Sequence, residues 1–400
     1  MTHNALVLSG GGAFAAYEVG VLKALMTGAA PFTRYRRIDP DIVTGTSAGC
    51  YNGAMLASRW AMEPVEAIAD IERVWLEDVA DNPCGNGVFR WRGNPLNFFD
   101  PACFVQNPLR FFWQRVDDVA FATRNLALRL RLLAQSPEPL EVRLIELLNF
   151  GNLISTHPFP DLIRRTVDFR ALRRSDIKFQ AITTDWMSGE LREFHNEDID
   201  DQRGPLILMA SAAIPGLFPP VDIPPSMFVD GGVLMNTPLS PAIHAGATHL
   251  HVIYVDPKVE DIPMSEVGAT LSTMQRMLYI GWAATVERDI RDAERINKTI
   301  EMWEAAKARG GTVGEGAAAF GRTAEILQDL ERGRRLRRVS IHRYRPRKVL
   351  GGALGMLNFA AEQSRDLIAR GFADAVEHDC VRERCVLPEG GPDEPEEHEG

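Results

Sequence analysis

The chain has 400 residues, of which 45% are hydrophobic and 24% are charged. This composition is typical of a soluble globular protein with room for one large domain or two ordinary ones. No apolar run approaches the ~20 residues needed to span a bilayer, and we recognise neither a signal peptide nor a nucleic-acid-binding module. We therefore expect a cytoplasmic protein, with transient contact to a membrane surface as its only membrane association.

The formal net charge of −10 is concentrated at the C-terminal end. Residues 388–400 contain six acidic residues and no lysine or arginine, and they are rich in proline and glycine. Such a segment cannot bury enough apolar surface to fold, so we expect a disordered, solubilising tail. The arginine-rich run at residues 332–348 could attract anionic lipid, or it could pair with the acidic tail or with nearby acids, and we favour the pairing.

The five cysteines are odd in number and scattered along the chain: Cys50, Cys84, Cys103, Cys380 and Cys385. This pattern indicates reduced thiols rather than a disulfide framework. None of them is paired with a histidine at the spacing typical of metal ligands. The sequence therefore predicts no metal site and no cofactor.

The beginning of the chain alternates between strand and helix patterns. An apolar run at residues 5–8 ends in glycines and is followed by a helical pattern over about 13–26. A second apolar run, residues 41–44, leads into a helical pattern over 48–59. Strand–helix–strand–helix at this spacing favours an α/β fold, with a mostly parallel central sheet and helices on both faces.

Residues 82–161 depart from this pattern, because aromatic and arginine side chains cluster there. Two helical stretches, 125–133 and 142–148, indicate a mostly helical insertion over one end of the sheet. Tryptophan, phenylalanine and arginine suit a membrane surface. No helix in the insertion separates a basic from an apolar face, however, so we interpret the aromatics as the core of the insertion.

The α/β pattern returns after the insertion. It predicts a strand at 177–184, a hairpin partner at 190–195, a buried helix at 205–213 and a further strand at 249–255. Beyond residue 256 the chain is mainly helical, with long helical patterns at 267–309 and 357–378 on either side of a strand at 339–344.

The most informative motif is Gly45-Thr46-Ser47-Ala48-Gly49. It lies where a strand pattern meets a helix pattern, which makes it a nucleophile elbow rather than a chance G-x-S-x-G string. A serine on such a turn projects its hydroxyl away from the backbone, and the flanking glycines remove side chains that would clash. Ser47 is therefore the predicted nucleophile of a serine acyl hydrolase.

The turn Gly10-Gly11-Gly12 is the candidate oxyanion hole. Adjacent glycines after a strand can direct consecutive backbone N–H groups at one point, and the following helix adds positive partial charge. Similar turns bind nucleotide phosphates. Here the Walker lysine is absent, Ala15 replaces the third glycine of a dinucleotide fingerprint, and no acidic residue ends a second strand.

The general base could be a histidine or a carboxylate. Several histidines follow Ser47 in the sequence, so their number does not exclude a Ser–His–Asp triad. In an α/β-hydrolase, however, several strands precede the nucleophile, whereas only one or two precede Ser47 here. Asp230 ends an apolar strand and is followed by Gly231 and Gly232, which allow close backbone approach. We therefore prefer Asp230 as the base, in a site dry enough to make a carboxylate effective.

Five segments in order resemble the successive motifs of the patatin-like phospholipase family: LSGGGAFAAYEVGVLKAL, GTSAGCYNGA, TTDWMSGEL, SAAIPGLFPPV and FVDGGVLMNTPL. The resemblance covers roughly residues 5–256. It implies an α/β/α sandwich that hydrolyses lipid acyl esters with a Ser–Asp dyad and without a metal. By position it assigns Ser47 as nucleophile, Asp230 as base and Gly10–Gly12 as the oxyanion loop.

From this resemblance we expect a catalytic domain at 1–256 with the insertion 82–161 inside it, a mainly helical region at 257–387 and the tail 388–400. Phe14 stands where family members commonly carry a basic residue, which puts a preference for anionic head groups in question. Two alternatives stay open, a transacylase on the same dyad and a non-catalytic lipid-binding or scaffolding protein with the same fold. The sequence predicts neither the head group nor the oligomeric state.

Overall fold

The computed structural model describes residues 3–30, 37–82, 85–91, 104–105, 108–135, 154–256, 258, 270–308, 337–352 and 355–388. The sequence-based predictions that lie outside these ranges include the helix at 142–148 and the acidic tail from residue 389 on.

The central sheet has eight strands, and its main path runs in the order β10-β9-β1-β2-β5-β8-β7, with β6 paired to β5. The five strands from β10 to β5 are parallel, and β6, β8 and β7 are antiparallel to their neighbours. The predicted mostly parallel sheet is therefore confirmed. Its strands are β1 (Asn4–Leu8), β2 (Ile42–Thr46), β5 (Lys178–Asp185), β6 (Leu191–His195), β7 (Val221–Ile223), β8 (Ser226–Asp230), β9 (His249–Ile253) and β10 (Ser340–Tyr344).

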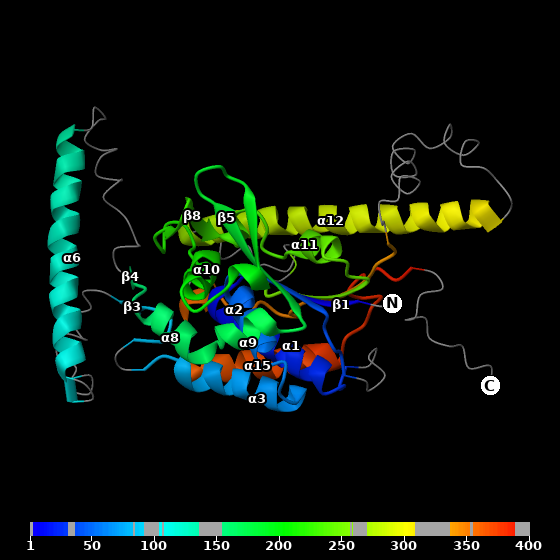
Figure 1. The fold of residues 1–400 in the computed structure, drawn as a ribbon, viewed down its shortest axis with the longest axis horizontal. Coiled ribbons are helices and arrows are strands. Elements are labelled where there is room, and N and C mark those ends of the chain that lie inside the picture. The colour runs from blue at the N-terminus through cyan, green and yellow to red at the C-terminus, as the bar shows by residue number, and fades with distance from the viewer. Residues whose placement is uncertain are drawn as a thin grey trace.

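Helices cover both faces of this sheet (Figure 1). The described α-helices are α1 (Ala16–Met26), α2 (Ser47–Ser58), α3 (Pro64–Arg73), α6 (Pro108–Gln135), α8 (Pro158–Thr166), α9 (Phe169–Arg174), α10 (Arg203–Ser211), α11 (Leu239–His244), α12 (Thr270–Ala308) and α15 (Ala361–Val376). In Figure 1, α1, α3 and α15 lie below the sheet, and α11 and α12 lie above it.

The three layers follow from the alternation of side chains along each strand. In β1, Leu6 and Leu8 belong to the apolar cluster that includes α1, α2 and α15. Ala5 and Val7 belong to the opposite cluster, which includes α11 and α12. A strand that is apolar on both faces is typical of a parallel sheet buried between two helical layers.

Residues after 256 belong to the same body as the N-terminal strands. β10 extends the sheet beside β9, and α15 packs directly on α1. A Cβ at Gly20 would lie 2.0 Å from the carbonyl oxygen of Ile368, and one at Gly371 would lie 2.0 Å from that of Tyr17. Two glycines thus bring the helix backbones into contact. The domain boundary at 256 stays a prediction, while the strand and helices predicted beyond it are present.

The described part of the insertion includes a long helix, α6, which spans the predicted helix at 125–133 and stands apart from the body at the left of Figure 1. A bidentate ion pair between Arg90 of strand β3 (Arg90–Trp91) and Asp118 ties it to the two-stranded sheet that β3 forms with β4 (Ile154–Ser155). Phe112 and Trp113 on α6 are 59% and 64% exposed. For these two side chains the interpretation as core is wrong, whereas Phe89 is buried.

Three arginines of the arginine-rich run form ion pairs with nearby acids: Arg338, Arg343 and Arg347. Arg343 pairs with Glu287 of α12, and Arg347 pairs with Asp374 and Glu377 around the end of α15. This outcome agrees with the expected pairing to nearby acids. None of the helices in the described ranges combines the length and the apolar character that crossing a bilayer requires.

Candidate active site

Ser47 occupies a strained turn between β2 and α2. Its φ of 55° lies in the left-handed region, which a residue with a side chain adopts only when the surroundings enforce it. The surroundings are tight, because a Cβ at Gly45 would lie 2.6 Å from Cα of Cys50 and one at Gly49 would lie 2.6 Å from the carbonyl oxygen of Ser9. The fold thus contains the predicted strand–turn–helix elbow, with Ser47 at its apex.

The register of β5 brings Asp230 to Ser47. One edge of β5 pairs with β6, and the other edge is shared between β2 and β8. Thr46 is opposite Ile182, and Asp230 is opposite the next residue, Thr183. The last residues of β2 and β8 therefore meet on the same edge of β5, although 184 positions separate Thr46 from Asp230 in the sequence.

Ser47 and Asp230 are hydrogen-bonded through their side chains and are only 4% and 5% exposed. Burial raises the pKa of the Asp230 carboxyl to about 7, against the opposing effects of the N–H of Gly232 and the hydroxyl of Ser47. The Gly232 N–H donates to Oδ1 of Asp230 over 2.7 Å. A carboxylate with a pKa near neutrality is a stronger base than an exposed one, which is what proton removal from a hydroxyl requires.

The glycine turn after β1 lies against the elbow. A Cβ at Gly10 would lie 3.0 Å from Cβ of Ser47, so only glycine fits there without displacement. The Gly10 N–H donates to the carbonyl oxygen of Asn236 over 3.0 Å. Among the described residues we find no acceptor for the N–H groups of Gly11 and Gly12, which open the short helix η1 (Gly12–Ala15). These two amides are available to an oxyanion.

Three polar side chains that sequence reasoning missed hold these elements together. The Ser47 N–H donates to Oγ of Ser211 (2.9 Å), whose own hydroxyl donates to the carbonyl oxygen of Ile182 (2.7 Å). Nδ2 of Asn236 donates to the carbonyl oxygen of Gly10 over 3.0 Å. Ser211 and Asn236 both lie within the motif segments quoted above. This position was the only signal in the sequence that could have marked them as candidates.

The third side chain, Trp282, comes from α12. Its Nε1–H donates to the carbonyl oxygen of Gly232 over 2.6 Å. This bond fixes the peptide that follows Gly232, and the peptide before Gly232 is the one whose N–H binds Asp230. Nothing in the sequence around Trp282 distinguishes it from the other aromatic residues of a long helix. Its role depends on where α12 crosses the molecule.

A cavity of about 250 Å³ opens beside Ser47. Its wall is mainly apolar and combines residues of the elbow, the proline-rich segment after α10 and the C-terminal region: Gly12, Ser47, Ala48, Tyr51, Trp75, Val79, Val88, Thr156, Phe159, Met209, Ala212, Ala213, Ile214, Phe218, Pro219, Pro220, Val221, Met356, Leu357 and Phe359. No histidine is among these residues. Among the described residues, no imidazole lines the cavity beside Ser47, whereas the carboxylate of Asp230, which is not part of the cavity wall, is hydrogen-bonded to Ser47.

Phe14 points away from solvent, under the C-terminal region. Its side chain is buried, and a Cβ at Gly355 would lie 2.8 Å from its ring. A Cβ at Gly12 would lie 2.4 Å from the carbonyl oxygen of Met356. The glycine turn and the short helix η9 (Gly355–Leu357) therefore pack against each other. The aromatic side chain of Phe14 takes part in this contact, at the position for which the family resemblance leads us to expect a basic residue.

Comparison with known proteins identifies the family of this arrangement. The model of the family described as patatin-like phospholipase matches residues 6–243. Among solved structures, VipD from Legionella pneumophila matches with a TM-score of 0.34 at 12% sequence identity, over 94% of this chain and 66% of that one. The chain thus spans just under two thirds of the length of VipD. No curated protein matches.

Proposed function

Because the chain belongs to the patatin-like phospholipase family, we propose that it cleaves acyl esters of lipids through a Ser47–Asp230 dyad. Membership of this family supports lipid acyl hydrolase activity in general. The observation that carries this proposal is the hydrogen bond between the hydroxyl of Ser47, which lines an apolar cavity, and a buried carboxylate. A nucleophile, its base and a hydrophobic pocket are the three parts that ester hydrolysis of a lipid requires.

In the first half-reaction, Oγ of Ser47 attacks the ester carbonyl carbon and Asp230 accepts the hydroxyl proton. The resulting oxyanion accepts hydrogen bonds from the N–H groups of Gly11 and Gly12. The amide of Gly10 is occupied by Asn236, so we assign Gly10 the steric role of letting Ser47 approach the turn. Collapse of the intermediate breaks the ester C–O bond, and the leaving alcohol takes the proton from Asp230.

In the second half-reaction, water attacks the acyl-enzyme. Asp230 accepts a proton from this water, and the second tetrahedral intermediate is held by the same two amides. When it collapses, Ser47 regains its proton from Asp230 and the fatty acid leaves. Each proton that Asp230 accepts is returned within the cycle, so the dyad needs no further base and no metal.

The acyl chain occupies the apolar cavity, and the substrate is a phospholipid, a lysophospholipid or a neutral lipid. The buried Phe14 supplies no charge beside the glycine turn, so recognition of an anionic head group would have to come from other residues. The alternatives are transfer of the acyl group to an alcohol acceptor by the same dyad, and lipid binding without catalysis.

A fluorophosphonate probe and a panel of acyl esters separate these possibilities. We expect the probe to modify Ser47 in the wild type and to leave Ser47→Ala unmodified, as judged by peptide mapping. Release of free fatty acid without an acceptor supports a hydrolase, and turnover that needs an added alcohol supports a transacylase. A folded wild-type protein that neither reacts with the probe nor releases fatty acid would support the scaffold.

We also propose that α6 contacts the lipid surface from the cytoplasmic side. Exposed tryptophan and phenylalanine side chains partition into the interface of a bilayer, and Phe112 and Trp113 are exposed together on this helix. The double variant Phe112→Ser/Trp113→Ser should reduce co-sedimentation with phospholipid vesicles. The control Met277→Ser removes an equally exposed apolar side chain from α12 and should leave vesicle binding unchanged. Equal binding by all three proteins would contradict the proposal.

A further inference from the structure

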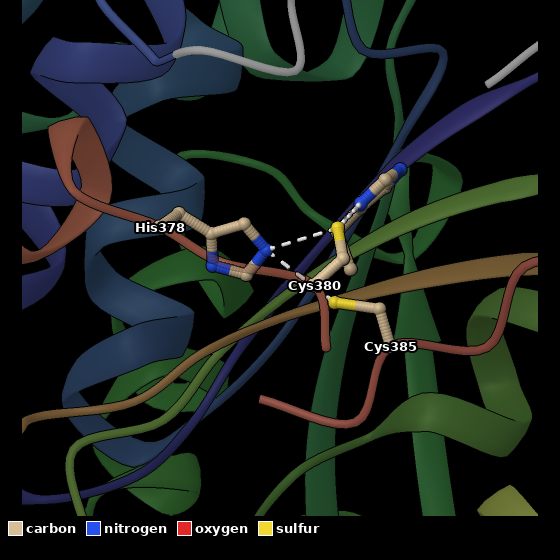
Figure 2. A group of neighbouring side chains, drawn as sticks. His378, Cys380 and Cys385 are labelled. Carbon is tan, nitrogen blue, oxygen red and sulfur yellow. Dashed lines mark hydrogen bonds between the residues drawn. The ribbon is translucent and has the colours of Figure 1, made fainter. Parts of the chain in front are cut away.

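Four sulfur- and nitrogen-bearing side chains converge at the C-terminal end of the fold, away from the cavity beside Ser47. They are His342 on β10, His378 just after α15, and Cys380 and Cys385 on the turn that follows. One ligand atom from each lies within 4.8 Å of every other. Figure 2 shows both sulfur atoms directed at the ring nitrogen of His378.

The distances within this cluster match those of a tetrahedral metal site. Sγ of Cys380 lies 3.5 Å from Nδ1 of His342 and 3.5 Å from Nε2 of His378, and Sγ of Cys385 lies 3.4 Å from Nε2 of His378. Zinc bonds of about 2.3 Å to sulfur and about 2.05 Å to nitrogen, at tetrahedral angles, separate the two atoms by about 3.6 Å. These three sulfur–nitrogen pairs already have the spacing of zinc ligands, and the other pairs, which lie within 4.8 Å, would close toward it when an ion binds.

The turn that carries the cysteines is held in place by its own backbone. The Cys385 N–H donates to the carbonyl oxygen of Cys380, and the Asp379 carboxylate accepts from the N–H groups of Val381 and Arg382. The Arg343 N–H donates to Sγ of Cys385 over 3.4 Å. Backbone N–H groups that donate to a ligand sulfur stabilise its thiolate form and orient it.

This turn is also paired with the edge of the sheet. Ile341 and Val386 exchange two backbone hydrogen bonds of 2.8 and 2.9 Å, so the segment after Cys385 lies antiparallel to β10. His342 follows Ile341 directly and is only 2% exposed, and His378 is 9% exposed. The cluster thus joins β10, the end of α15 and the last described segment of the chain.

We propose that His342, His378, Cys380 and Cys385 bind one Zn²⁺ ion as a structural site. Two thiolates and two imidazoles at tetrahedral spacing form a ligand set that zinc prefers. Binding replaces the two thiol protons, which are released to solvent. All four positions are filled by protein, so the site has no open position for substrate and takes no part in the ester hydrolysis.

The ion would anchor the far end of α15. That helix packs on α1 through Gly20 and Gly371, and the residues just before it, Leu357 and Phe359, form part of the cavity wall. Sequence reasoning predicted no metal site, although His378, Cys380 and Cys385 lie close together in the sequence, because the fourth ligand is distant. His342 precedes Cys380 by 38 residues, and only the fold brings the two together.

The direct test is the metal content of the full chain, expressed with zinc in the medium and freed of loose metal by gel filtration. We expect about one zinc per chain for the wild type and less than about a fifth of that for Cys380→Ser and for His342→Asn. Cys50→Ala, which removes a free cysteine outside the cluster, should retain the wild-type content. A wild type without zinc, or a Cys380→Ser variant with full zinc content, would overturn the proposal.

Cobalt provides a second readout that does not depend on the stability of a variant. Refolding or exchange with Co²⁺ should give the intense visible bands of a tetrahedral ion together with thiolate-to-cobalt charge transfer, and added Zn²⁺ should abolish both. A disulfide between Cys380 and Cys385 is the competing outcome. Intact mass spectrometry that finds this bond in freshly purified, metal-free protein, with no cobalt spectrum after reduction, would also overturn the site.

Discussion

The N-terminal part of the molecule, residues 6–243, and the part after residue 270 contribute to the candidate site in different ways. The first part supplies every group that would react, since Ser47, Asp230 and the glycine turn all lie within it. Among its described residues, the second supplies no group to the proposed reaction. It adds β10 to the sheet, Met356, Leu357 and Phe359 to the cavity wall, and Trp282 to the peptide beside Gly232. Chemistry is concentrated in short motifs, whereas the pocket is assembled from residues far apart in the chain.

The largest expected effect belongs to the first part. Ser47→Ala should lower ester hydrolysis on the order of 10⁴-fold or more, because removal of a nucleophile leaves only the oxyanion donors and binding. The control Ser58→Ala changes a serine at the other end of the same helix, α2, and should retain most of the activity. Circular dichroism and thermal unfolding check that both variants are folded. If Ser47→Ala kept substantial turnover, the first part would not supply the nucleophile, and the proposed difference between the two parts would be contradicted.

A change in the second part should alter substrate selection instead of abolishing catalysis. Leu357→Trp would fill part of the cavity, so we expect long-chain esters to lose about 10- to 100-fold in kcat/KM, corresponding to about 1–3 kcal/mol, while short-chain esters are affected little. The measurement is kcat/KM across a series of p-nitrophenyl esters of increasing chain length. Leu387→Trp, outside the cavity, serves as the matched control, and a uniform loss across the series would contradict the assignment of the acyl pocket.

The smallest effect is expected at Trp282, which we regard as a positioning residue. Trp282→Phe removes the hydrogen bond to the carbonyl oxygen of Gly232, and one such bond is worth about 0.5–1.5 kcal/mol, or about 2- to 10-fold in rate. We expect this loss in kcat, with KM unchanged and the pH profile displaced, because the neighbouring N–H of Gly232 binds Asp230. A change confined to KM would place Trp282 in substrate binding.

Much of the fold followed from local sequence patterns. The strand before Gly10, the elbow at Ser47 and the hairpin after Asp185 are each encoded within a few residues, and the structure contains all three. Asp230 was preferred as the base because it ends an apolar strand before two glycines, and the family resemblance assigned it the same role. The shared edge of β5 that brings it to Ser47 is not visible in a linear pattern. Trp282, Phe359 and the cluster at Cys380 could not be found this way, since their neighbours are set by how helices and the C-terminal turn pack.

The raised pKa of Asp230 makes stability depend on pH. The folded pKa of about 7 lies above the ordinary value of 3.8, so the folded state binds more protons between these two values. Stability contributed by the protonated carboxyl is therefore lost as pH rises from about 4 to about 7. Asp230→Asn, which mimics the protonated form, should be more stable than the wild type at pH 8, and this advantage should shrink toward pH 4 in urea unfolding.

The most direct test of the dyad is the pH dependence of kcat/KM for the wild type and for Asp230→Asn. If Asp230 deprotonates Ser47, the wild-type value rises with pH through a single ionisation at about 7 and then levels off, because the base acts only when ionised. Asp230→Asn should lose this ionisation and on the order of 10³-fold or more in rate. An Asp230→Asn enzyme that keeps the wild-type rate and profile would contradict the dyad and return the role of base to a histidine.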